Sequence, residues 1–323
     1  EPPPPPAPPP AAPRRGAAEP GAHPFRDAAP IEAAALGPAA RLIDPPAALI
    51  PLAAELARSE RGFCLATETT SEEPMRAALV GIGVTTGERP AYVPVRHREG
   101  TNIPIEKVRE ILGPVLADPE TLKVGQHLKY DTLVLLREGL PVAGLGFDTL
   151  IASYLLEPEG AHGLDHLSRL HLGVEKIPTR TLLGGGRGLR TMDELPIEVV
   201  GPYCGEDVHC TWLLRDLFEP QLADRQQESL FHDVEMALVP VLVAMEHEGV
   251  YVDTGFLATM SEKLGRELNR LEAAIHTAAG GPFNINSGPQ LSEILFKKLG
   301  LPAKRQTKTG FSTSADVLEE LAP

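Results

Sequence analysis

The sequence predicts an α/β domain with a mixed central sheet, followed by an all-α region. Segments with strand-like alternation and segments with helical spacing follow one another up to about residue 222, which is typical of a sheet covered by helices. Beyond that residue only helical spacing remains. At the start, 12 of the 33 prolines fall within the first 30 residues, which predicts an extended linker. The predicted domains are therefore 1–36 (linker), 37–222 (α/β) and 223–323 (all-α).

The α/β region begins with a helix and three strands. Leucines at helical spacing over 45–62 predict a helix that ends at Gly62. Alternation over 63–69 predicts a buried strand, and 77–95 predict a hairpin with its turn at 86–90. The later predicted elements are helix 103–119, strand 122–126, helices 129–139, 147–158 and 163–173, a glycine-rich loop at 182–188, and helix 202–220 with Pro202 near its first turn.

The all-α region is predicted to contain four helices. The first covers 231–249 and ends at Gly249. A long amphipathic helix follows, with Asp253 or Thr254 as its N-cap. Two shorter helices are predicted over 286–300 and 312–322, separated by a basic segment that contains glycine.

Charge and cysteine content exclude several classes of protein. A net charge of −14 argues against a protein that binds nucleic acid over its whole surface, although it allows a local groove. Three cysteines without a CxxC pair favour neither a disulfide framework nor a structural zinc site. The sequence contains no run of 18 apolar residues and no leader, so a cytoplasmic location is expected. A chain that opens on a linker without Met also predicts that a folded region precedes it.

Three separate segments carry acidic side chains in positions suited to chemistry. Ala66 and Glu68 share one face of the strand over 63–69, where a metal platform normally has two carboxylates. Asp131 lies in the first turn of a helix that follows a buried strand, where it also favours the helix dipole. Tyr203 and Asp207 are four residues apart on one helix face. Taken singly, each has an ordinary explanation as a solvated, dipole-stabilising or core residue.

In this order and spacing, the segments resemble the proofreading 3′-5′ exonuclease domain of bacterial DNA polymerase I (family A). The resemblance is carried by "GFCLATET", "LKVGQHLKYD", "FDTLIASYLLEP", "GLDHLSRL" and "YCGEDVHCTWLL". It implies an RNase H-like exonuclease fold. "VEMALVPVLVAMEHEGVYVD" and "FNINSGPQLSEILFKKLGL" resemble the opening of the polymerase region of that family, a partial helical thumb. The palm motifs of the family do not follow, so no polymerase active site is expected in the chain.

The resemblance implies a two-metal site with one ligand missing. Members of this exonuclease group hold two Mg²⁺ or Mn²⁺ ions with four carboxylates; one ion generates the attacking hydroxide and the other stabilises the leaving 3′ oxygen. Glu68, Asp131 and Asp207 match three of these ligands, and Tyr203 matches the tyrosine that orients the attacking water. Ala66 stands where the family has the aspartate that contacts both ions. We therefore expect a persistent fold and DNA-end pocket with severely weakened hydrolysis.

The resemblance also implies DNA as the partner, with a single-stranded 3′ end in the exonuclease pocket and duplex at the thumb. Gln126 and His127 are expected to contact DNA in the pocket, and His127 stands where the family commonly has Asn. The basic residues Lys304, Arg305 and Lys308 are expected to contact duplex phosphates, or else to form a solvated loop. The rest of the polymerase would be the other partner, with a 5′ nuclease domain joined through the linker, in the nucleoid region of the cytoplasm.

Two alternatives stay open at this point. The first is a catalytically silent exonuclease fold that acts as a scaffold or DNA-binding module. The second is a free-standing exonuclease of the RNase D type that trims RNA. The second is disfavoured because such enzymes carry a different helical domain in place of "FNINSGPQLSEILF".

Overall fold

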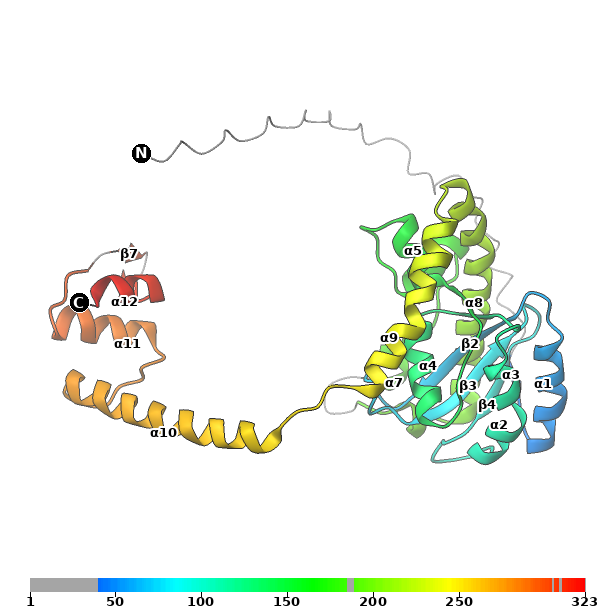
Figure 1. The fold of residues 1–323 in the computed structure, drawn as a ribbon, viewed down its shortest axis with the longest axis horizontal. Helices are drawn as coiled ribbons and strands as arrows, with labels where there is room; N and C mark the ends of the chain where they lie inside the picture. Colours follow the sequence, from blue (N-terminus) through cyan, green and yellow to red (C-terminus); the bar gives the residue numbers. More distant parts are fainter. Residues whose placement is uncertain (1–39, 185–188, 304, 308–309, 323) are drawn as a thin grey trace, which may run out of the picture. The chain divides into compact units, whose positions relative to one another are not determined.

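The chain folds into two compact units that divide at Gly249. The computed structural model describes residues 40–184, 189–303, 305–307 and 310–322. The first unit extends to Gly249 and the second begins at Val250 (Figure 1). In the described part of the chain, no helix combines the length and the apolar character needed to cross a membrane.

A mixed six-stranded sheet forms the centre of the first unit, as predicted. Its order is β1-β4-β3-β2-β5-β6. β3 is antiparallel to both β2 and β4, whereas β5 and β6 extend the sheet in parallel from β2, and β1 is parallel to β4. The strands are β1 (Arg41–Leu42), β2 (Phe63–Thr69), β3 (Leu79–Thr85), β4 (Ala91–Pro94), β5 (Lys123–Gly125) and β6 (Leu145–Asp148).

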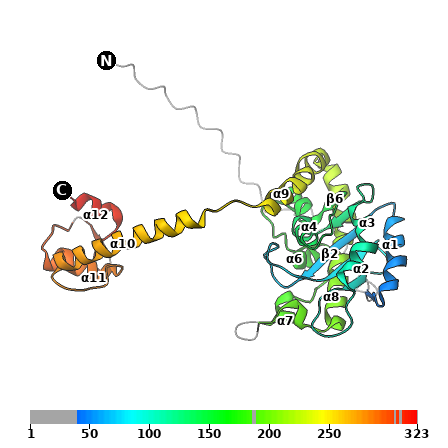
Figure 2. The same cartoon turned by 60° about the horizontal axis from the view of Figure 1, so that its bottom comes forward.

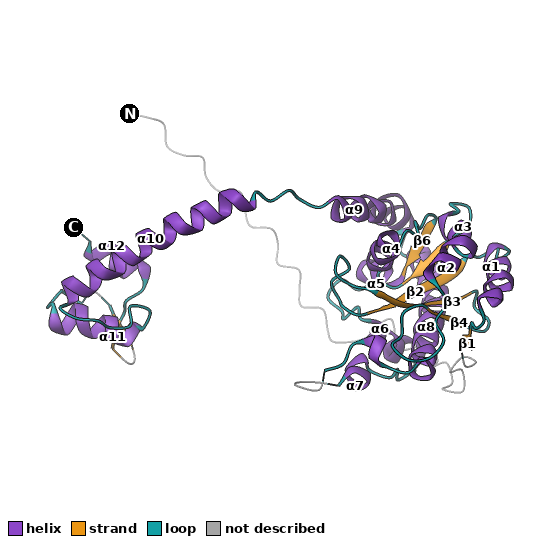
Figure 3. Cartoon of the chain, turned by 90° about the horizontal axis from the view of Figure 1, so that it is seen from below, coloured by secondary structure: helices purple, strands orange, loops and turns teal. Residues whose placement is uncertain are grey.

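Helices cover both faces of this sheet (Figures 2 and 3). Their bounds are α1 (Leu49–Ala57), α2 (Ile105–Ile111), α3 (Gly113–Ala117), α4 (Leu128–Arg137), α5 (Thr149–Leu156), α6 (Leu164–Leu167), α7 (Thr179–Leu183), α8 (Ile197–Asp224) and α9 (Ala237–Glu248). Short helical turns are η2 (Pro46–Ala48), η3 (Ser168–Leu172), η5 (Met192–Glu194) and η6 (Leu230–Met236).

Strand alternation divides the core between the two faces. Phe63 and Leu65 of β2 pack into the cluster formed with α1, α2 and α3. Cys64 points the other way, into the cluster under α5 and α8, and Ala66 packs against that side as well. The two faces of β2 therefore pack against different helices, and the face that carries Ala66 packs against α8.

Gly83 lets α8 approach the sheet closely, because a Cβ atom there would lie 2.5 Å from Cys204 Sγ. Gly81 instead makes room for Tyr92 of the neighbouring strand β4, since its Cβ would lie 2.1 Å from the Tyr92 hydroxyl. α8 begins at Ile197, five residues before the start that the sequence suggested, so Pro202 lies in its second turn. The proline is tolerated there because its side of the helix is exposed.

The second unit is mainly helical. It contains α10 (Thr254–Ala279), α11 (Gly288–Ser292), the π-helical turn η7 (Glu293–Lys298), the hairpin β7 (Gln306–Thr307) and β8 (Gly310–Phe311), and α12 (Ala315–Leu321). Asp253 is the N-cap of α10, because its side chain accepts a 2.8 Å hydrogen bond from Phe256 N. The hairpin was not predicted; it lies in the basic segment between the two last helices.

Candidate functional site

The predicted site residues lie on three different elements. Glu68 lies near the carboxyl end of β2, Asp131 in the first turn of α4, and both Tyr203 and Asp207 on the face of α8 that meets the sheet. Glu68, Asp131 and Tyr203 are each 5–6% exposed, while the Asp207 side chain keeps 19% exposure. These are buried acids, which is unusual unless each one has a partner.

Asp131 joins α4 to β2. Its Oδ1 accepts hydrogen bonds from Thr67 N at 2.9 Å and from Thr67 Oγ1 at 2.6 Å. Burial raises the pKa of Asp131 to about 7, even though both bonds from Thr67 favour the charged form. The charge of Asp207 contributes to the increase, so these two carboxyl groups lie close enough to repel each other.

Glu68 faces the same pocket. Burial raises its pKa well above the ordinary value, and the charges of Asp207 and Asp131 raise it further. A contact with the Cys204 thiol and the positive charge of Lys176 act in the opposite direction. The charges of three acids from distant segments therefore act on one another beside α8. We call this group, Glu68, Asp131 and Asp207, the acid pocket, and its role as a metal site stays a prediction.

A lysine that the sequence did not single out lies among these acids. Lys176 is in the segment between η3 and α7, and its side chain is 1% exposed. Its ammonium forms an ion pair with Asp207, lies 3.3 Å from Asp165 Oδ1, and stands 5.1 Å from the centre of the Tyr203 ring. Burial raises the pKa of Asp207 to about 6, with Lys176 opposing the shift.

Tyr203 is held in place from the other side. Its hydroxyl lies 2.7 Å from Thr179 Oγ1, and either oxygen can be the donor. Burial, followed by the charges of Asp207 and Glu68, raises the pKa of Tyr203, so the phenol stays neutral. The ring thus forms a wall of the pocket with its hydroxyl already engaged.

Ala66 supplies no oxygen to the pocket. It is partly buried among apolar side chains that include Tyr203 and Cys204, and it lies opposite Gly83 in the antiparallel ladder. Among the residues that the structure describes, no three His, Cys, Asp or Glu side chains are grouped so as to hold a metal ion. With a methyl group at position 66 and an ammonium against Asp207, the side chains present do not fit a two-ion site.

The two residues predicted to contact DNA in the pocket make internal hydrogen bonds. Gln126 Nε2 donates to the His162 carbonyl at 2.8 Å, and Gln126 Oε1 accepts from the Thr149 hydroxyl. His127 adopts a left-handed conformation with φ of 70°, which His and Asn tolerate better than most residues. Its backbone N donates to Asp148 at 3.0 Å, and its side chain is exposed. A contact of either residue with DNA stays a prediction.

The basic segment of the second unit is only partly described. Lys304 and Lys308 lie outside the described residues. Arg305 forms an ion pair with Asp316 at 2.7 Å and lies 3.5 Å from Glu320. A guanidinium that is exposed and paired in this way remains accessible, and its expected role at duplex phosphates stays a prediction.

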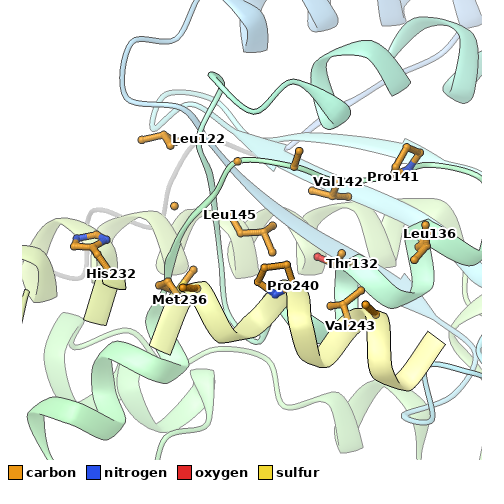
Figure 4. A pocket seen from close by; sticks show the side chains of 15 residues that line it. Leu122, Thr132, Leu136, Pro141, Val142, Leu145, His232, Met236, Pro240 and Val243 are labelled. Carbon is orange, nitrogen blue, oxygen red and sulfur yellow. The ribbon is translucent and has the colours of Figure 1, made fainter. Parts of the chain in front are cut away.

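A separate apolar cavity lies on the other side of α4. It has a volume of about 730 Å³ and is bounded by α4, α9 and the segment that leads into β6 (Figure 4). Its lining is largely Leu, Val, Pro and Ala, with Thr132 and His232 as polar members. None of the predicted site acids lines it, so the cavity is distinct from the acid pocket.

Replacing Asp131 with Asn is expected to stabilise the protein more as the pH rises. Folding raises this pKa from 3.8 to about 7, so the folded state binds the proton more tightly and wild-type stability falls as pH rises through that window. The variant keeps an Oδ1 acceptor for Thr67 but carries no charge. We expect it to be roughly 2–4 kcal/mol more stable than wild type at pH 8, and less so at pH 5.

Urea unfolding from pH 5 to pH 8 measures this difference. Glu159→Gln is the control, because Glu159 is an exposed acid in a turn. It should leave the pH dependence of the free energy of unfolding unchanged. A difference in the free energy of unfolding between wild type and Asp131→Asn that does not increase with pH would contradict the expected titration.

Comparisons with known proteins show which families the chain resembles. Residues 41–223 match the family model described as 3'-5' exonuclease, and residues 254–323 match the model described as DNA polymerase family A. DNA polymerase I of Synechocystis sp. is 38% identical over 262 residues, and that of Rhizobium leguminosarum is 39% identical over 279 residues. Each alignment covers 79% of this chain but only 26% and 27% of the respective relative.

A solved structure shows the same fold. The POL domain of Pol1 from M. smegmatis, in complex with DNA primer-template and dNTP, matches with a TM-score of 0.67 and 24% identity, covering 87% of this chain and 45% of that one. The match of 254–323 to the family A polymerase model disfavours the RNase D alternative, for which a different helical domain was expected. Residues 254–323 are thus similar to family A DNA polymerases, and the chain belongs to the 3'-5' exonuclease family, whose model matches residues 41–223.

Proposed function

We propose that the first unit is a proofreading-type exonuclease module that accommodates the 3′ end of a DNA strand but hydrolyses it very weakly. The observation that carries this proposal is Ala66, which faces α8 at the position where the family has a metal-binding aspartate. Glu68, Asp131, Tyr203 and Asp207 retain the residue types of the family site. The proposed site therefore keeps these four residue types and lacks the central ligand.

The weak activity would follow from weak metal binding. Exonucleases and polymerases of this kind use divalent metal ions, and carboxylates are the ligands that Mg²⁺ and Mn²⁺ prefer. Here Glu68, Asp131 and Asp207 are the remaining candidate ligands. Asp131 is engaged by Thr67 and Asp207 by Lys176. Weakened affinity for Mg²⁺ or Mn²⁺ is the expected consequence.

The second unit supports a role within a polymerase. One face of α10 carries large apolar side chains that are exposed in the described unit: Phe256, Leu257, Met260, Leu264, Leu268, Leu271 and Ile275. Their spacing of three and four residues marks one helix face. We propose that other polymerase segments cover this face, that Lys304, Arg305 and Lys308 contact duplex DNA, and that the parent protein acts in replication and repair in the bacterial cytoplasm.

A scaffold function is the second candidate. It is favoured by the internal pairing of pocket groups, since Lys176 neutralises Asp207 and the Gln126 amide is bonded within the protein. A scaffold would bind an internal single-stranded segment as tightly as a strand with a free 3′ end. A proofreading-type module would bind the strand with a free 3′ end more tightly.

An end-labelled DNA assay tests the proposed function. The purified chain is incubated with a 3′-labelled single strand in 5–10 mM Mg²⁺ or Mn²⁺, roughly the saturating range for exposed carboxylate sites. We expect mononucleotide release no faster than from an Asp131→Ala/Asp207→Ala control. Prompt release by wild type that the control abolishes would refute the proposal. Binding of the same strand is followed by fluorescence anisotropy in parallel.

A further inference from the structure

We propose that the ammonium group of Lys176 is a built-in counter-ion of the acid pocket, which takes the place of a divalent ion and excludes it. The inference depends on the geometry around Lys176 and uses the proposed function only to identify the pocket. It explains how a nuclease-type cluster of acids can be balanced by a side chain of the protein itself.

The first argument is the burial of the charge. A lysine side chain that is 1% exposed is stable only if its charge is compensated nearby. Asp207 and Asp165 supply that compensation directly, and the ring face of Tyr203 adds a cation–π contact. Burial lowers the pKa of Lys176, but the charge of Asp207 more than offsets this and leaves the pKa raised, so the amine is an ammonium.

The second argument is that the backbone holds Lys176 in this position. Ile177 N donates to Glu206 Oε2 at 3.3 Å, and Thr179 Oγ1 is bonded to the Tyr203 hydroxyl at 2.7 Å. Both contacts fasten the segment that follows Lys176 to α8, the helix that carries Asp207. The ammonium is thus placed by an anchored following segment, and not by its own flexible side chain alone.

The third argument is competition for the same oxygen atoms. A divalent ion needs carboxylate lone pairs at about 2.0–2.6 Å, and the ammonium already occupies Oδ1 of Asp207. Two cations beside one carboxylate also repel each other. Position 66 carries a methyl group, so it supplies no oxygen atom that could help a divalent ion compete with Lys176. Restoring an aspartate at 66 alone should therefore fail to create a metal site.

Metal-dependent thermal stability tests the proposal on the full chain, with Mn²⁺ as the probe. Wild type and Ala66→Asp should show no pocket-specific rise in Tm and no stoichiometric Mn²⁺ binding by electron paramagnetic resonance. Lys176→Met keeps the length of the side chain and leaves Asp207 without its cation. We expect its Tm at pH 8 to fall by roughly 5–10 °C without metal. With Mn²⁺ most of that loss should be recovered. Ala66→Asp/Lys176→Met should respond most strongly.

Two further variants guard against simple misfolding. Lys129→Met removes a partly buried lysine that pairs with Glu246 outside the pocket, and it should show no Mn²⁺ response. Lys176→Met/Asp207→Asn removes both charges; it should fold with nearly the wild-type Tm and also ignore Mn²⁺. If Lys176→Met alone does not fold, this double variant still tests whether charge balance is what Lys176 provides.

The outcomes separate this inference from the proposed function. Stoichiometric Mn²⁺ binding by wild type that is lost in Asp207→Ala would overturn the counter-ion role, even if the protein remains inactive on DNA. A Lys176→Met protein with unchanged Tm and no Mn²⁺ response would overturn it as well. Nucleotide release by a wild type that binds no Mn²⁺ would instead refute the proposed function and leave the counter-ion role standing.

Discussion

Replacing Asp148 with Ala is expected to destabilise the first unit by about 3–5 kcal/mol. This carboxylate is 2% exposed and accepts three backbone hydrogen bonds, from His127 N at 3.0 Å, Leu128 N at 2.7 Å and Leu150 N at 2.9 Å. It lies at the end of β6 and therefore caps the first turns of both α4 and α5. Alanine would leave three N–H groups buried without a partner and would remove a negative charge from two helix N-termini.

Urea unfolding followed by circular dichroism measures this loss. Asp148→Asn should fall between wild type and Asp148→Ala, since one oxygen can still accept from His127 N and Leu150 N while the amide faces Leu128 N. Asp224→Ala, at an exposed position near the end of α8, is the control and should stay within about 0.5 kcal/mol of wild type. A loss below about 1 kcal/mol for Asp148→Ala would show that water satisfies the orphaned N–H groups.

The sequence predicted the strands whose own residues show alternation. It missed the strands that form because a neighbouring strand pairs with them. Alternation identified β2 and the β3–β4 hairpin, and both are confirmed. β1 has two residues and β6 has four, "LGFD", so neither contains enough alternation to be recognised. Both exist because a neighbouring strand pairs with them, β4 in one case and β5 in the other. Such pairing is a tertiary effect that local patterns do not contain.

The same distinction applies to the pocket. Glu68, Asp131 and Asp207 stood out because each acid has a regular position on a strand or helix, and in the structure the charges of Asp207 and Asp131 act on Glu68. Lys176 could not be found this way, since it lies in an irregular segment. Its role depends on its ion pair with Asp207, which lies 31 residues further along the chain. A lysine is ordinarily a surface residue, and nothing in "GVEKIPT" indicates that this one is buried.

Replacing Gly83 with Val is expected to cost about 3 kcal/mol or more, at the upper end of the range for overpacked cores. The Cβ atom alone would lie 2.5 Å from Cys204 Sγ and 3.2 Å from Val208 Cγ1, so α8 would have to move away from the sheet. Gly83 pairs with Ala66 across the ladder. The movement would therefore separate Asp207 from Glu68 as well as loosen the core.

A double-mutant cycle with Cys204 tests whether this close approach is the cause. Gly83→Ala in the wild-type background should lose about 1–3 kcal/mol, whereas in a Cys204→Ala background, which lacks the sulfur atom, the loss should be smaller by about 1 kcal/mol. Gly113→Ala is the matched control, because its Cβ would meet only Leu140 Cδ2 at 3.7 Å, an ordinary contact. Additive effects of Gly83→Ala and Cys204→Ala would contradict the steric argument. Coupling would instead show that the missing side chain of Gly83 lets α8 lie against the sheet. Ala66 packs against the cluster that contains Cys204, so an aspartate at position 66 must compete with this packing as well as with Lys176.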